Sequence, residues 1–450
     1  MAARRGDVTS APARTLGPFE AVRDLTYEAP FPDLIPVRQD AEAPEEADVP
    51  AAVARELEPL RARIRPGMTV AVTAGSRGIA DIATVVRAAG AWLRDAGAEP
   101  FIVPAMGSHG GATADGQRGV LAHYGITEDT MGMPIRATMD TVDLGRVPGG
   151  PAVHLDRHAS EADAILLVNR VKAHTDFSGP VESGLAKIAA IGLGKQRGAE
   201  GIHAYGAQHL GHWVTKVARR LADSGRLLGG LALVENARER TARVAFVEPE
   251  GVGGAAEEAL LVQSQQLMGR IPFDELDVLV VDEMGKNVSG SGMDTNVIGR
   301  MMIRGSQEFE RPHISTIAVL ALTGESYGNA VGLGLADFIP FRVLEALDLR
   351  ATYINAVTAG NGGVQRGQIP MALPTDRDAI AAAILMCGRP DPEGVRLARI
   401  RSTLETSELL VSESLRDEVA RHPNLEVCGA ARPMAFDGAG ALTGWDGPPG

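Results

Sequence analysis

Cysteine is scarce in this sequence. Cys387 and Cys428 are the only two cysteines among 450 residues, so there is no CxxC pair. So few cysteines argue against a disulfide scaffold, a thiolate zinc site and an iron–sulfur cluster. We therefore expect a protein of the reducing cytoplasm.

Long apolar runs and an excess of positive charge are missing as well. No stretch approaches 18 uninterrupted apolar residues, and no apolar segment of a secretion signal follows the arginines near the amino terminus. The formal net charge of −13 would repel the phosphates of a nucleic acid. We expect no membrane span, no secretion signal and no nucleic acid partner.

What the sequence does contain is an alternation of short β-rich runs with helical patterns. The β-rich runs cover 69–73, 99–104 and 162–171. The helical patterns cover 51–64, 81–97, 116–125 and 212–230. This alternation predicts an α/β fold with a mostly parallel sheet and helices on both faces. Ligands of such sheets bind beyond the carboxyl ends of the strands.

A second α/β unit begins after a helical pattern at 255–270. Strand-like runs follow at 273–281 and 315–323, and we predict a loop over 359–376 before a further helix. A chain of this length, with 45% apolar residues, has room for more than one core. We predict an N-terminal catalytic and cofactor-anchoring domain over 1–270 and a C-terminal α/β domain over 271–450. The active site would lie in the cleft between them.

Three side chains capable of chemistry follow three of the predicted strands. Arg77 in "TAGSRG", His109 in "MGSHGG" and His174 in "NRVKAHTD" each come shortly after a strand. An arginine can hold a carboxylate or phosphate in bidentate fashion. A histidine can act as a general base near neutral pH or as a metal ligand. Parallel packing of the strands would bring all three side chains together.

A glycine-rich stretch over 178–201 follows His174. Its glycines leave backbone N–H groups able to approach an anion, although the stretch contains neither a Walker motif nor a GxGxxG fingerprint. Lys187 lies within it, and a shielded lysine can be a nucleophile or a covalent anchor. His203 comes next, and imidazole ligands without cysteine suit nickel or iron as well as zinc.

Over roughly residues 15–210, and more loosely after 270, these motifs resemble those of the nickel-dependent lactate racemase family. Arg77 in "AGSR" matches a family arginine, with Ala74 where the family has an aspartate. "GSHGGAT", with His109 and Thr113, is similar to the next family motif.

The glycine-rich stretch carries the rest of the resemblance. His174 to Lys187 is similar to the family's loop that opens with a histidine and ends in a lysine, with a short insertion. His203 follows Lys187 at the family's interval. The resemblance implies two α/β domains with the active site between them.

The resemblance also implies roles for individual residues. The family lysine carries a covalently attached nickel pincer nucleotide, so Lys187 inherits the attachment and His203 the role of nickel ligand. His109 and His174 would be the catalytic acid/base pair, and Arg77 would orient the substrate carboxylate or contact the cofactor. The implied cofactor-binding residues are Lys187, Ser183, Gly184, Thr113, Lys286 and Asn296, with Arg300 as a further neighbour.

These residue types suit the inversion of a 2-hydroxy acid. The carbinol carbon is too weak an acid for a histidine to deprotonate at neutral pH. Hydride transfer to an electron-poor pyridinium avoids the carbanion, while one histidine serves the hydroxyl of each enantiomer. The expected partners are a small 2-hydroxy acid and the enzymes that make the cofactor.

Two other classes of function are compatible with the same residues. One is a divalent-metal-dependent hydrolase or lyase with His109, His174 and His203 as ligands. The other is a catalytically silent protein that binds a nucleotide or an organic acid in the cleft. Nickel with added mass on Lys187 distinguishes the racemase from both.

Overall fold

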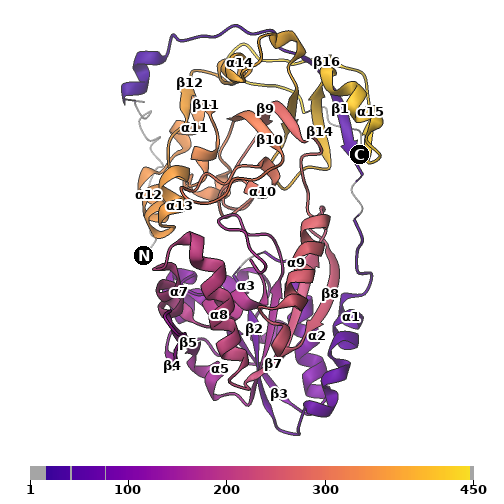
Figure 1. The fold of residues 1–450 in the computed structure, drawn as a ribbon, viewed down its shortest axis with the longest axis vertical. Helices are drawn as coiled ribbons and strands as arrows, with labels where there is room; N and C mark the ends of the chain where they lie inside the picture. Colours follow the sequence, from indigo (N-terminus) through magenta and orange to yellow (C-terminus); the bar gives the residue numbers. More distant parts are fainter. Residues whose placement is uncertain (1–16, 41–42, 77, 446–450) are drawn as a thin grey trace, which may run out of the picture.

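The structure is a computed structural model that describes residues 17–40, 43–76 and 78–445. Two α/β lobes lie one above the other along the long axis (Figure 1). The first lobe runs from α1 (Val49–Leu57) to α9 (Ala255–Leu267). The second lobe consists of β1 (Asp33–Gln39) and the chain from β9 (Glu275–Val281) onward. The predicted class, a two-unit α/β fold, is confirmed.

The first lobe is built on a five-stranded sheet in the order β3-β2-β6-β7-β8. The first four strands are parallel, and β8 runs antiparallel to β7. Their nearly continuous apolar sequences are typical of strands covered on both faces. The strands are β2 (Thr69–Ala74), β3 (Glu99–Pro104), β6 (Ala164–Arg170), β7 (Leu227–Glu235) and β8 (Thr241–Val247).

Helices cover both faces of this sheet. Val70 and Val72 of β2 lie in a core shared with α1 and α2 (Ile82–Asp95). Ala71 belongs to the opposite core, which includes α8 (Leu210–Ala222) and α9. The remaining elements of this lobe are α3 (Ala114–His123), α4 (Glu128–Met131), β4 (Thr141–Arg146), β5 (Ala152–Asp156), α5 (Arg157–Glu161), α6 (Leu185–Lys187) and α7 (Lys195–His203).

The second lobe contains a nine-stranded sheet in the order β12-β11-β10-β9-β13-β14-β1-β15, with β16 also paired to β1. The strands from β12 to β13 are parallel, whereas β14, β1, β15 and β16 pair antiparallel with their neighbours. The added strands are β10 (His313–Val319), β11 (Phe338–Pro340), β12 (Met371–Leu373), β13 (Leu397–Ile400), β14 (Glu408–Ser412), β15 (Leu425–Val427) and β16 (Arg432–Pro433).

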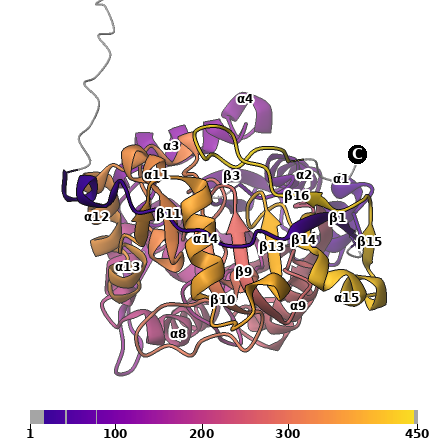
Figure 2. The same cartoon turned by 90° about the horizontal axis from the view of Figure 1, so that it is seen from above.

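One long helix covers a face of this second sheet. Seen from above, α14 (Asp376–Met386) lies across the strands around β9 and β10 (Figure 2). Ala379 and Ile380 of α14 lie in a buried core with Val278 and Val280 of β9. The other helices of this lobe are α10 (Thr295–Ile298), α11 (Phe341–Ala346), α12 (Leu349–Thr358), α13 (Asn361–Arg366) and α15 (Arg416–Arg421).

The strand β1 lies in the second lobe although its residues fall in the range 1–270 predicted for the first domain. It pairs with β14 from Leu34 opposite Ser412 to Arg38 opposite Glu408. Ile35 and Val37 are buried in the core of the second sheet. The chain passes from the first lobe back to the second between α9 and β9, near residue 270. The domain division at 270 stays a prediction.

Two segments differ from the sequence-based expectation. The helix predicted over 212–230 ends at Ala222, because Gly225 has a φ of 71° and the apolar run after it pairs with β6 as β7. The loop predicted over 359–376 contains α13 and β12. Pairing with a neighbouring strand decided β7 and β12, and local periodicity does not report such pairing.

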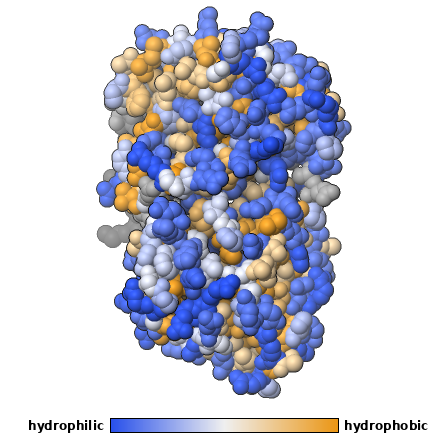
Figure 3. All heavy atoms as spheres, viewed as in Figure 1, coloured by the Kyte–Doolittle hydropathy of each residue, from blue (hydrophilic) through white to orange (hydrophobic). Residues whose placement is uncertain are grey.

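The surface is that of a polar protein. Hydrophilic residues cover most of the face shown in Figure 3, with apolar residues scattered among them. Within the described ranges, every helix is too short or too polar to cross a bilayer.

Candidate active site

The carboxyl ends of three parallel strands meet at one place in the first lobe. The N–H of Ala105, just after β3, donates to the carbonyl of Ala74, the last residue of β2, at 2.8 Å. Asn169, near the end of β6, donates its side-chain amide to the carbonyl of Gly184 at 2.7 Å. The N–H of Gly107 donates to the carbonyl of Gly192 at 3.2 Å. The ends of β3 and β6 therefore both contact the glycine-rich stretch.

Lys187 ends the short helix α6 at this convergence. Its Nζ lies 2.5 Å from Nε2 of His174. The imidazole of His174 stacks on the ring of Phe177, with centroids 4.4 Å apart and an interplanar angle of 29°. The amine and the imidazole, thirteen positions apart in the chain, form one pair in space.

The neighbouring backbone sets the tautomer of His174. The N–H of Asp176 donates to Nδ1 of the ring at 3.0 Å, so Nδ1 carries the lone pair. In the neutral imidazole the proton then lies on Nε2, which points to the Lys187 amine. An amine and an imidazole nitrogen thus share one short contact at this place.

Charged side chains surround this pair. Burial raises the pKa of Asp176, but the positive charges of His174, Arg366 and Lys187 outweigh it and bring the pKa down to about 2. Burial lowers the pKa of His203, and the ammonium of Lys187 lowers it further, against the opposing effect of Asp176. His203 is therefore neutral at physiological pH, with a nitrogen lone pair for a metal.

His109 lies on the loop after β3. Its Nδ1 donates to the carbonyl of Met106 at 2.8 Å, so the neutral ring presents an unprotonated Nε2. The side chain is exposed. The same loop contacts the turn after Lys187 through Gly107 and Gly192.

Thr113 and Ser183, predicted to bind the cofactor, have structural contacts. The Thr113 hydroxyl accepts the N–H of Gly116 at 3.0 Å and caps the amino terminus of α3. Ser183 and Lys172 exchange backbone hydrogen bonds of 2.9 and 3.2 Å. Their predicted roles toward a cofactor stay predictions.

The buried carboxylate of Glu257 occupies the amino terminus of α6. It accepts the N–H of Ala186 at 3.0 Å and that of Gly253 at 2.8 Å. Burial raises the pKa of Glu257, and these N–H donors oppose the rise. The helix end that the sequence suggested as an anion site is therefore filled by a side chain of α9.

Gly184 is required by this close approach. An added Cβ would lie 2.1 Å from Oε1 of Glu257. We expect Gly184→Ala to lower the free energy of unfolding by about 2 kcal/mol, because a buried carboxylate must shift. Gly201→Ala, where an added Cβ meets nothing within 4 Å, should be neutral or stabilising. Denaturant titration of the two variants tests this difference.

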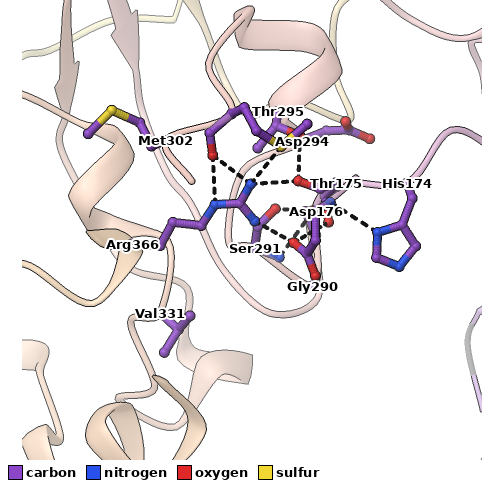
Figure 4. A network of polar contacts seen from close by, with 12 residues as sticks. His174, Thr175, Asp176, Gly290, Ser291, Asp294, Thr295, Met302, Val331 and Arg366 are labelled. Atoms are coloured by element: carbon purple, nitrogen blue, oxygen red, sulfur yellow. Dashed lines mark hydrogen bonds and ion pairs between the residues drawn. The ribbon is translucent and has the colours of Figure 1, made fainter. Parts of the chain in front are cut away.

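Residues of the second lobe contact the turn 174–176 (Figure 4). Arg366 of α13 forms an ion pair with Asp176 and donates to the carbonyl of Thr175 at 2.6 Å. The Arg366 side chain is 3% exposed. The Thr295 hydroxyl donates to the same Thr175 carbonyl at 3.0 Å. An arginine buried in the second lobe thus fixes a turn of the first.

Asn296 also reaches this turn. Its side-chain amide donates to the carbonyl of His174 at 3.3 Å. Lys286 instead donates to the carbonyls of Gly290 and Val331, at 2.7 and 3.3 Å. Its predicted cofactor contact stays a prediction. The contacts of Arg300 that we describe, with Asp337 at 2.8 Å among them, lie within the second lobe.

Glu182 fixes the same turn from inside the first lobe. Its carboxylate accepts the N–H of His174 at 2.5 Å and that of Gly179 at 3.1 Å. Burial raises the pKa of Glu182 to about 7, although the two N–H donors lower it. The side chain is therefore protonated in part of the molecules at neutral pH.

This raised pKa predicts a pH-dependent stability. Between pH 4.5 and 7 the folded chain binds the Glu182 proton more tightly than the unfolded chain, so stability falls as pH rises. The effect on the free energy of unfolding is about 3 kcal/mol over the window. Glu182→Gln should remove this component, so urea titrations of both proteins from pH 4 to 8 should converge toward low pH. A constant difference would contradict the assignment.

Within the described part of the chain, no cluster of three or more histidine, cysteine or acidic side chains has the geometry to hold a metal ion. Arg77, predicted to orient the substrate, lies outside the described residues. Ala74, which stands where the family has aspartate, is fully buried at the end of β2 among Val70, Val72 and other apolar residues.

The residues that sequence reasoning missed are Glu182, Glu257, Lys195 and Arg366. Each is a buried charged side chain, and buried charge is the signal that marks such positions. The sequence alone does not show which charged residues are buried, since all four lie in stretches of ordinary polarity.

The sequence matches no family model and no curated protein. Among solved structures, it is similar to a Thermotoga maritima protein at 14% identity and a TM-score of 0.43, covering 71% of this chain and 81% of that one. It is also similar to the lactate racemase apoprotein of Thermoanaerobacterium thermosaccharolyticum at 11% identity and a TM-score of 0.43, covering 83% and 89%. Likenesses at this level say nothing of the site residues.

Proposed function

We propose that the protein is an isomerase that inverts the carbinol carbon of a 2-hydroxy acid with a nickel pincer nucleotide attached to Lys187. The observation that carries this proposal is the pair formed by Lys187 and His174, 2.5 Å apart at the convergence of three strand ends. An amine for attachment and an imidazole for proton transfer lie side by side. The sequence resemblance assigned these two roles to the same two residues.

The residues present fit such a cofactor. Lys187 offers an amine beside the imidazole of His174, the functional group that covalent attachment requires. His203 offers one neutral imidazole, and a metal held largely by its organic ligand needs few protein ligands. When bound, this cofactor supplies the two-electron redox step at the carbinol carbon.

The chain itself supplies proton transfer and positioning. His109 presents an unprotonated Nε2 in its neutral form, which can take a hydroxyl proton. His174 serves the hydroxyl of the opposite enantiomer, once Lys187 is engaged by the cofactor. Asn296 and Arg366 hold the His174 turn against the second lobe, which restricts the movement of the ring.

The partners of this function are a small 2-hydroxy acid and the enzymes that make the cofactor. The acidic net charge and the cysteine content suit a cytoplasmic protein, which stays a prediction.

The test is intact mass and metal analysis of protein produced with the cofactor-making enzymes in nickel-supplemented cells. We expect added mass on the peptide that contains Lys187 and about one nickel per chain, followed by racemisation of a 2-hydroxy acid in a substrate screen. Bound metal with an unmodified Lys187 would favour the hydrolase or lyase. Neither metal nor added mass would favour the silent binder.

A further inference from the structure

We infer that Lys195 is a positioning residue for His109, acting through Gln117. The catalytic part of this inference rests on the proposed function, in which His109 transfers a proton. The structural part does not depend on it. Lys195 begins α7, lies behind the site with 0% exposure and touches none of the residues proposed to react.

Lys195 has three polar partners in the interior. Its Nζ donates to Oε1 of Gln117 at 3.0 Å and to the carbonyl of Pro104, and it forms an ion pair with Oδ2 of Asp156 at 3.0 Å. Oδ2 of Asp156 accepts no hydrogen bond from the described residues, so charge alone links it to Lys195. Asp156, Gln117 and Lys195 are all 0% exposed, so solvent replaces none of these contacts.

Lys195 determines which way the amide of Gln117 points. Because an ammonium only donates, the oxygen of Gln117 must face Lys195 and its NH₂ must face away. That NH₂ donates to the carbonyl of Gly107 at 2.9 Å and to the carbonyl of His109 at 3.4 Å. Lys195 thereby fixes the Gln117 amide in the orientation that donates to the carbonyls of Gly107 and His109.

The loop depends on contacts with other elements to keep its conformation. Gly107 and Gly110 have φ angles of 59° and 67°, a region where glycine is favoured. The His109 ring is held by its own bond to the Met106 carbonyl, which is three residues away in the same loop. If Gln117 no longer donates to the Gly107 and His109 carbonyls, the loop can move. The hydrogen bond to the Met106 carbonyl then no longer fixes the tautomer of the His109 ring.

The backbone strain at Lys195 and the burial of its charge are both unfavourable, which supports a role for Lys195 beyond packing. Lys195 has a φ of 54°, a strained value for a residue with a side chain. Burial lowers its pKa, against the opposing charge of Asp156. A buried ion pair is often replaceable by apolar residues of similar volume without loss of stability. An apolar replacement would leave Gln117 without a donor on its oxygen, so the pair supplies an orientation that packing alone does not.

The experiment removes the charged pair as a unit. In the double variant Lys195→Met with Asp156→Asn, no unpaired charge remains in the core, and Asn keeps an oxygen for the N–H of Ala159 that Asp156 now accepts. Nitrogen NMR of the His109 ring in the protein without cofactor reports the tautomer. We expect the Nδ1–H form to dominate in the wild type and to lose its preference in the double variant.

Cofactor-loaded protein gives the second readout. We expect the double variant to lose kcat on the order of 100-fold with KM within about twofold, since a displaced general base impairs proton transfer and not substrate binding. Gln117→Leu, which removes the amide alone, should reproduce both changes. Arg399→Met is the control, because Arg399 forms an ion pair with Asp282 in the second lobe at 2.8 Å, in which the side chains are 7% and 24% exposed.

The outcomes separate the two claims. An unchanged His109 tautomer in a folded double variant would overturn the positioning role, whatever the enzyme does. A loss of the His109 tautomer preference in Arg399→Met would also overturn the positioning role, because the loss would then follow from a general fall in stability. A shifted tautomer in a protein that racemises nothing would retain the positioning role and reject the proposed function.

Discussion

Lys187→Ala is expected to leave the protein folded but without attached cofactor and without turnover. The variant removes the amine that lies 2.5 Å from His174 Nε2, and no other atom at that place can form the covalent bond. Activity should fall to the uncatalysed level, a loss on the order of a million-fold or more. Intact mass, nickel content and racemase activity of the same preparation measure all three consequences.

A matched lysine makes this result specific. Lys216 lies exposed on α8 of the same lobe, and Lys216→Ala should keep added mass, nickel and activity at wild-type levels. Full racemase activity in Lys187→Ala would refute covalent attachment at this residue. Lys187→Arg adds a further check, because a guanidinium keeps the positive charge but cannot serve as the nucleophile.

Arg366→Met is expected to loosen the contact between the lobes. The arginine is almost fully buried and joins Asp176, the Thr175 carbonyl and the Met301 carbonyl. Removing it leaves two carbonyls and a carboxylate that is 42% exposed without this donor, at about 2 kcal/mol of unfolding free energy. We also expect kcat to fall on the order of 100-fold, because the turn that carries His174 is released.

The pH dependence of stability that comes from Asp176 gives this prediction a second readout. Arg366 is one of three positive charges that bring the pKa of Asp176 to about 2, so its removal should raise that pKa. Stability from Asp176 is present above its unfolded pKa and lost as pH falls toward 2, and this acid-dependent loss should shrink in Arg366→Met. Arg399→Met should lose stability without changing the Asp176 titration. Equal titrations in all three proteins would contradict the interlobe role of Arg366.

The order of strands and helices in the first lobe could be predicted because each element carries its own signal. "TVAVT" is an apolar run of strand length, and α2 has the apolar spacing of a helix. Residues placed just after parallel strands lie at one edge of the sheet, so a contact between the loop after β3 and the glycine-rich stretch after β6, made by Gly107 and Gly192, follows from the pattern.

The second lobe was harder because its contacts are made over long distances in sequence. The segment "DLIPVRQ" has no period that distinguishes it from a connection, and it becomes β1 only by pairing with strands near the other end of the chain. The loop predicted over 359–376 contains "NGG", which in the structure begins α13, whose last residue is Arg366. A glycine-rich start conceals a helix from local analysis, since tertiary contacts override propensity.

The burial of the charged side chains around the site, such as Glu257 and Lys195, could not be predicted either. Glu257 lies in "AAEEALL", where nothing marks the first glutamate as buried and the second as exposed, and only the packing of α9 on α6 decides it. Lys195 in "GLGKQRG" reads as a surface lysine, as most lysines are. Whether a charged side chain is buried depends on tertiary packing, which the local sequence does not show.

The pairing of β1 also determines how the two lobes can be made and moved. The chain passes from the second lobe to the first between β1 and α1, and back again between α9 and β9, so two covalent tethers join the lobes. Any opening must turn about an axis close to both tethers, which excludes free rotation. During synthesis β1 leaves the ribosome first and must wait for β14 and β15, while the whole first lobe can fold in between. A fragment that starts at α1 would leave an open edge on β14, ready to pair with another chain.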